Sequence, residues 1–105
     1  LELRRIDEAV ASYDRALALE PNLAQIHHNR GTALLAGLRL NEALASFDHA
    51  VALQPHHAEA HNNLGIVFLR SGRPRDAERC FSTALRLQPD FFDAKENLAA
   101  ARSRL

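Results

Sequence analysis

The chain of 105 residues has the length of one small domain, and its 13 Lys and Arg residues balance 13 Asp and Glu residues. A net charge of zero lacks the positive field that draws proteins onto phosphate backbones, so we expect no nucleic-acid partner. The longest apolar stretches are only a few residues, far short of the roughly 20 that a transmembrane helix needs, so we expect no membrane span. The single cysteine, Cys80, excludes an internal disulfide framework and makes a reducing compartment, the cytoplasm, the default location.

An internal repeat governs the whole sequence. Pro21, Pro55 and Pro89 follow one another at intervals of 34 residues. A shift by this offset also aligns small, large and polar residues with one another. The aligned sets are Ala9, Ala43 and Ala77; Tyr13, Phe47 and Phe81; Ala16, Ala50 and Ala84; Leu19, Leu53 and Leu87; and Asn29, Asn63 and Asn97. The sequence therefore predicts a repeat architecture with one period.

Two amphipathic helices are expected in each period, because apolar residues recur at spacings of three and four. The pattern predicts six helices, at roughly residues 5–20, 22–36, 40–53, 57–71, 74–88 and 90–104. Asn22 and Asp90 are the expected N-caps of two of them, with Gln25 and Asp93 as capping-box partners. The predicted fold class is all-α, with repeat units whose neighbours stack into one continuous core.

The aligned positions resemble the tetratricopeptide repeat. The unit that resembles it best carries Leu64, Gly65, Phe68, Ala77, Phe81, Ala84 and Pro89. The resemblance implies an α-solenoid of antiparallel helix pairs, wound into a right-handed superhelix, and a single domain over residues 1–105. That domain would comprise a partial repeat with only a second helix (1–23), two complete repeats (24–57 and 58–91), and a first helix of a further repeat or a capping helix (92–105). Residues 61–65, His-Asn-Asn-Leu-Gly, are also similar to the repeat arms of O-linked N-acetylglucosamine transferases and related bacterial repeat proteins.

Four positions depart from the pattern of the family. Arg30 stands where Leu64 predicts an apolar residue, and Leu38 replaces the usual Gly before a second helix. His27 and His61 stand where the family often has Trp. We expect the apolar stem of Arg30 to cover the core while its charged head reaches water.

The resemblance implies a concave groove lined by the first helices that holds an extended peptide or a partner helix. An Asn side chain offers both an acceptor and a donor to a peptide backbone, so the aligned Asn row is the main candidate site. The predicted peptide-binding residues are Asn29, Asn63, Asn97, His28, Asn62, Thr32, Ile66 and Leu69. Members of the family that clamp a terminal carboxylate use basic and Asn side chains. The matching places hold His28, Thr32, Asn63, Asp93 and Asn97, which disfavours such a clamp.

No catalytic site is expected, because the sequence shows no nucleophile with a base at a plausible offset, no Gly-rich phosphate loop and no facing carboxylates. His57 and His61 have the spacing of two metal ligands on a helix, but no carboxylate or cysteine completes a set, so we predict neither a metal nor a cofactor. The predicted function is a non-enzymatic protein-interaction module. Two alternatives remain: a recruiting arm of a larger enzyme such as a glycosyltransferase, and a self-assembly module.

The two ends of the chain are expected to differ. Lys95 and Arg102 would solvate the outer face of the last helix. The first helix would expose part of an apolar face made of Ile6, Ala9, Tyr13 and Ala16. Such a patch favours self-association through this helix, and we expect further repeats before Leu1 in the parent protein.

Overall fold

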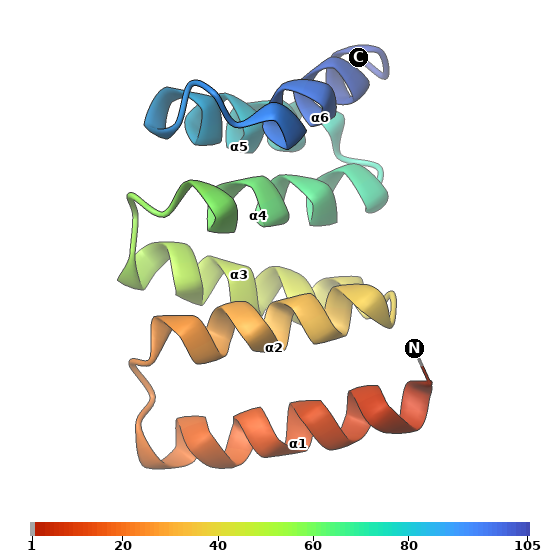
Figure 1. Ribbon diagram of the computed structural model, residues 1–105. Helices are drawn as coiled ribbons and strands as arrows, with labels where there is room; N and C mark the ends of the chain where they lie inside the picture. Colours follow the sequence, from red (N-terminus) through yellow and green to blue (C-terminus); the bar gives the residue numbers. More distant parts are fainter. Residues whose placement is uncertain (1) are drawn as a thin grey trace. The chain divides into compact units, whose positions relative to one another are not determined.

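The computed structural model describes residues 2–105, and this part of the chain contains six α-helices and no strand (Figure 1). It divides into two compact units, one ending at Pro55 and the other beginning at His56. The first unit holds α1 (Leu3–Leu19), α2 (Ala24–Ala36) and α3 (Leu40–Leu53). The second holds α4 (Ala58–Arg70), α5 (Pro74–Leu87) and α6 (Phe92–Arg102). The predicted all-α class is confirmed.

The helix ends lie within two residues of the predicted ones, but the predicted capping boxes are wrong. The N-caps of α2 and α6 are Leu23 and Phe91, and neither makes a side-chain capping hydrogen bond. Each turn after a proline takes one residue more than expected, so Asn22 and Asp90 lie outside the cap position. Both helices therefore begin without a polar side-chain cap, beside apolar residues that remain exposed: Leu23 is 36% and Phe92 is 65% exposed.

A phenylalanine ring lies over a glycine in the core of each unit. A Cβ on Gly31 would lie 2.8 Å from the ring of Phe47, and a Cβ on Gly65 would lie 2.5 Å from the ring of Phe81. Both rings are fully buried. The small residues that align at the 34-residue offset thus let the first helix of each pair approach the aromatic side chain of the second.

The first helix, α1, exposes less apolar surface than expected. Ile6 is only 1% exposed, and its side chain lies against Gly37, where a Cβ would approach it to 2.9 Å. Ala9, Tyr13 and Ala16 are half-buried. The expectation of an exposed Ile6 is therefore wrong, because the glycine at the end of α2 leaves room for this side chain within the first unit.

The turns inside the two helix pairs share a left-handed residue. Leu38 has a φ of 58° and Gly72, one repeat later, has a φ of 75°. Glycine adopts this conformation freely, whereas a Cβ makes it costly.

Next to Leu38, the Arg39 guanidinium lies 2.7 Å from the carboxylate of Asp7 on α1 and 2.9 Å from that of Glu42 on α3. The hydrogen bonds that Arg39 donates to Glu42 hold the pKa of Glu42 below its usual value and raise the pKa of Arg39.

Candidate functional site

Two asparagines join neighbouring first helices in the second unit. Asn97 on α6 donates from Nδ2 to Oδ1 of Asn62 on α4 at 3.1 Å. Asn62 is 5% exposed and Asn97 is half-buried. An amide group has two donors and a carbonyl that accepts twice, so this bond leaves N–H groups on Asn62 and a carbonyl on Asn97 for further partners.

Apolar side chains of α4 continue this surface toward the end of the helix. Ile66 and Leu69 are half-buried and pack against the core cluster that contains Ala77, Phe81 and Ala101. Their inner atoms are held by the core, while their outer atoms remain accessible. The face thus combines amides with rigid apolar contact area.

Charge is distributed unevenly along the first helices of the second unit. Glu59, Asp93 and Glu96 are exposed in the first two turns of α4 and α6. At the other end of α4, the Arg104 guanidinium donates to the carbonyl of Leu69 at 3.4 Å. One end of this face is therefore acidic and the other carries a cation.

The predicted residues of the first unit all lie on α2 and make local hydrogen bonds. Gln25 donates from Nε2 to Oδ1 of Asn29 at 2.9 Å, and the Thr32 hydroxyl donates to the carbonyl of His28 at 3.0 Å. His28 is 8% exposed, and its ring stands edge-on to Phe47 with centroids 5.7 Å apart. Asn29 keeps its amide donors on the surface, whereas His28 mainly packs.

The eight predicted residues are thus divided between three helices. His28, Asn29 and Thr32 lie on α2; Asn62, Asn63, Ile66 and Leu69 lie on α4; and Asn97 lies on α6. Within the second unit, the structure joins Asn62 and Asn97 directly.

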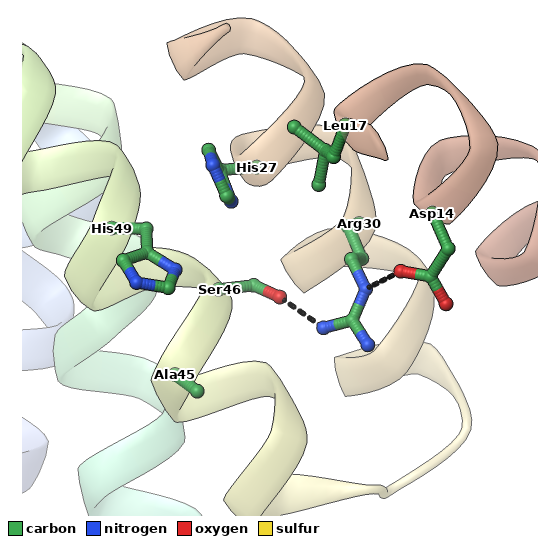
Figure 2. Close-up of a pocket in the computed structure, with 7 residues that line it drawn as sticks. All are labelled: Asp14, Leu17, His27, Arg30, Ala45, Ser46 and His49. Atoms are coloured by element: carbon green, nitrogen blue, oxygen red, sulfur yellow. Dashed lines mark hydrogen bonds and ion pairs between the residues drawn. The ribbon is translucent and has the colours of Figure 1, made fainter. Parts of the chain in front are cut away.

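Sequence reasoning missed a polar hollow in the first unit (Figure 2). The guanidinium of Arg30 does not simply reach water. Its Nε lies 2.8 Å from the Asp14 carboxylate on α1, and its Nη1 donates to the Ser46 hydroxyl on α3 at 2.7 Å. Two departures from the family pattern, Arg30 at the position of Leu64 and His27, both line this hollow and were the sequence signals that pointed here.

None of the helices within residues 2–105 combines the length and the apolar character of a membrane span. The same described residues bring no three His, Cys, Asp or Glu side chains together as a potential metal site.

Comparison with models of known protein families identifies the family to which the chain belongs. A model described as "Tetratricopeptide repeat" matches residues 22–90, and one described as "TPR repeat" matches residues 2–36. The chain belongs to the tetratricopeptide repeat family. No curated protein matches the sequence of this tetratricopeptide repeat chain.

Solved structures share the fold of this tetratricopeptide repeat chain. The first TPR domain of Spaghetti (RPAP3), bound to the HSP90 peptide SRMEEVD, is 22% identical over 94% of this chain and 79% of its own, with a TM-score of 0.91. A crystal structure of MamA is 21% identical over 93% of this chain and 57% of its own, with a TM-score of 0.90. The predicted all-α helical solenoid is confirmed.

Proposed function

We propose that this chain is a non-enzymatic protein-interaction module that holds an extended peptide on the faces of its first helices. The hydrogen bond between Asn62 and Asn97 carries the proposal. It orients two amides on neighbouring first helices, so that unused N–H and C=O groups are available to a peptide backbone. Ile66 and Leu69 offer apolar contact on α4. On α2, Asn29 and Thr32 form the corresponding face of the first unit, with His28 behind them.

The full Asn row, Asn29, Asn63 and Asn97, is part of this proposal, as is its likeness to the Asn rows of O-linked N-acetylglucosamine transferase arms. A peptide backbone presents a donor and an acceptor at every residue, so amide side chains can bind it without reading its side chains. We also propose a cytoplasmic setting, supported by the single cysteine in the sequence.

The kind of peptide differs in our proposal from that in the RPAP3 complex, whose peptide SRMEEVD is acidic at its end. Asp93, Glu59 and Glu96 place carboxylates on the first turns of α4 and α6, where they repel a terminal carboxylate. We expect no saturable binding of SRMEEVD to this chain in calorimetry. Binding of SRMEEVD as strong as binding of selected peptides would contradict this part of the proposal.

A random peptide library displayed on phage tests the groove itself. Peptides selected on the full chain should bind the Asn63→Ala variant roughly 2- to 10-fold more weakly, since one hydrogen bond is lost at about 0.5–1.5 kcal/mol. The triple alanine variant of Asn29, Asn63 and Asn97 should lose more. Asn22→Ala, on an exposed turn, is the matched control. Equal affinity of the triple variant for every selected peptide would refute the groove.

A further inference from the structure

The hollow in the first unit lies on the side of α2 away from the proposed peptide-binding face. His27 and Arg30 line it from α2, whereas Asn29 and Thr32 of the proposed face lie roughly opposite, given about 100° per residue in a helix. Asp14 lines the hollow from α1. Figure 2 shows side chains from α1, α2 and α3 converging on this space.

The size of the hollow suits one ring system. Its volume is about 260 Å³. Engineered apolar cavities of about 150 Å³ bind benzene, whereas pockets for drug-sized ligands measure about 300–1,000 Å³. The space thus admits a group larger than benzene and smaller than most cofactors.

The walls of the hollow favour an aromatic ring. Leu17 from α1 and Ala45 from α3 provide apolar contact near the opening. The rings of His27 and His49 pack against each other with centroids 4.7 Å apart and planes inclined by 53°. His27 is only 8% exposed, so the exposed ring of His49 offers most of the accessible π-surface. Aromatic rings gain from offset or tilted contact with such surfaces.

The polar groups of the hollow are fixed in place. Arg30 is bound to Asp14 and to Ser46, which is only 1% exposed, so the guanidinium is held in one orientation with N–H groups to spare. His27 donates from Nε2 to the carbonyl of Pro21 at 2.8 Å, which fixes the orientation of its ring. Because Asp14 balances the charge of Arg30, the hollow favours a neutral ring with a polar edge over a bare anion.

We infer that this hollow receives one tyrosine or tryptophan side chain from a partner protein. The ring stacks on His49, beside His27, and lies near the Arg30 guanidinium, a favourable cation–π contact, while its hydroxyl or indole N–H uses the fixed polar groups. This second contact point is separate from the peptide-binding face, so either can fail without the other.

Blocked amino acids test the chemistry of the ring. In a two-dimensional NMR titration of the full chain, N-acetyltyrosinamide and N-acetyltryptophanamide should bind saturably with a Kd of about 1–10 mM, in keeping with ligands of this size. N-acetylleucinamide should bind at least about 10-fold more weakly, because it lacks the ring and the polar edge. Equal shifts with all three, or no saturable binding of the aromatic ones, would overturn the inference.

Two variants locate the binding. Ala45→Leu covers the opening from an exposed helical position, and His27→Trp fills the space from α2. Each should weaken binding of the aromatic amides at least about 10-fold. Ala99→Leu makes the same exchange at an exposed site on α6 and should leave binding unchanged. If His27→Trp does not fold, Ala45→Leu still decides the question, and undiminished binding to it overturns the inference.

The source of the ring is tested with peptides. Phage-displayed peptides selected on the triple alanine variant of Asn29, Asn63 and Asn97 should be enriched in Tyr or Trp, and should lose binding with Ala45→Leu added but not with Ala99→Leu added. Binding of the free aromatic amides without any such peptide would contradict a protein partner and identify a small-molecule pocket instead.

Discussion

The helix pair α2–α3 and the helix pair α4–α5 are two copies of one sequence pattern with different polar contents. Both place a buried phenylalanine over a glycine, Phe47 over Gly31 and Phe81 over Gly65. They differ where Arg30 in the first pair replaces the buried Leu64 of the second. The shared positions specify how two helices approach each other. At the differing position, Arg30 bonds to Asp14 and Ser46, whereas Leu64 is a buried apolar residue.

The largest effect is expected where the two pairs agree. Gly65→Leu should cost about 1–3 kcal/mol of unfolding free energy, because its side chain would occupy the space of the Phe81 ring. Gly31→Leu should cost a similar amount against Phe47. Urea unfolding monitored by circular dichroism measures both. An unchanged midpoint in either variant would show that the two cores are not equivalent.

Substitutions in the two turns should change the stability of the protein in opposite directions. Leu38→Gly should stabilise the protein by roughly 1 kcal/mol, because glycine adopts the left-handed conformation that Leu38 now occupies. Gly72→Leu should destabilise it by about 1–2 kcal/mol for the same reason. No neighbour lies within 4 Å of a Cβ at Gly72, so the second variant tests the backbone alone. Thermal unfolding that shifts in the same direction for both would contradict the conformational explanation.

The hydrogen bond from Arg30 to Ser46 in the first helix pair can be replaced by an apolar contact. Arg30→Leu should cost about 1 kcal/mol, because the buried Ser46 hydroxyl loses its donor. Adding Ser46→Ala should recover most of that loss, because no unpaired hydroxyl then remains. A double-mutant cycle from urea unfolding gives the coupling. Strictly additive effects would mean that the bond from Arg30 to Ser46 contributes nothing to stability.

The smallest effect concerns pH. Arg39 holds the pKa of Glu42 below its usual value, so this carboxylate adds stability above its ordinary pKa and the contribution is lost as pH falls through the lowered pKa. The stability difference between the protein and Glu42→Gln should therefore shrink between about pH 7 and pH 3. Glu20→Gln, at an exposed position beyond α1, is the control and should show less pH dependence. An identical pH profile for both variants would exclude the role of Arg39.

The sequence predicted the six helices because the 34-residue register repeats the same apolar spacing, from Ala9 to Ala77 and from Tyr13 to Phe81. It did not predict where α2 and α6 begin. Polar side chains at Asn22 and Asp90 looked like caps, but the helices start one turn residue later. Local capping preferences are weak compared with the packing of the helix that follows.

The candidate site could be predicted only in part from the sequence. The alignment pairs Asn97 with Asn63, whereas the residue that Asn97 contacts is Asn62, so the alignment could not show this hydrogen bond. The hollow around Arg30 depends on side chains from three helices. One substitution in a repeat marks such a place, whereas its partners, Asp14 and Ser46, become visible only when the helices are packed.

The attachment of α1 has a consequence for how the first unit responds to ionic strength. Asp7 and Asp14, both more than half exposed, tie α1 to Arg39 and Arg30 of the following helix pair. Dissolved ions screen exposed pairs over about 10 Å at 0.1 M and about 3 Å at 1 M. Added salt therefore weakens these two ion pairs, whereas the apolar contact of Ile6 with Gly37 persists. At high ionic strength the attachment of α1 to the following helix pair then depends mainly on the apolar packing of Ile6 and Val10.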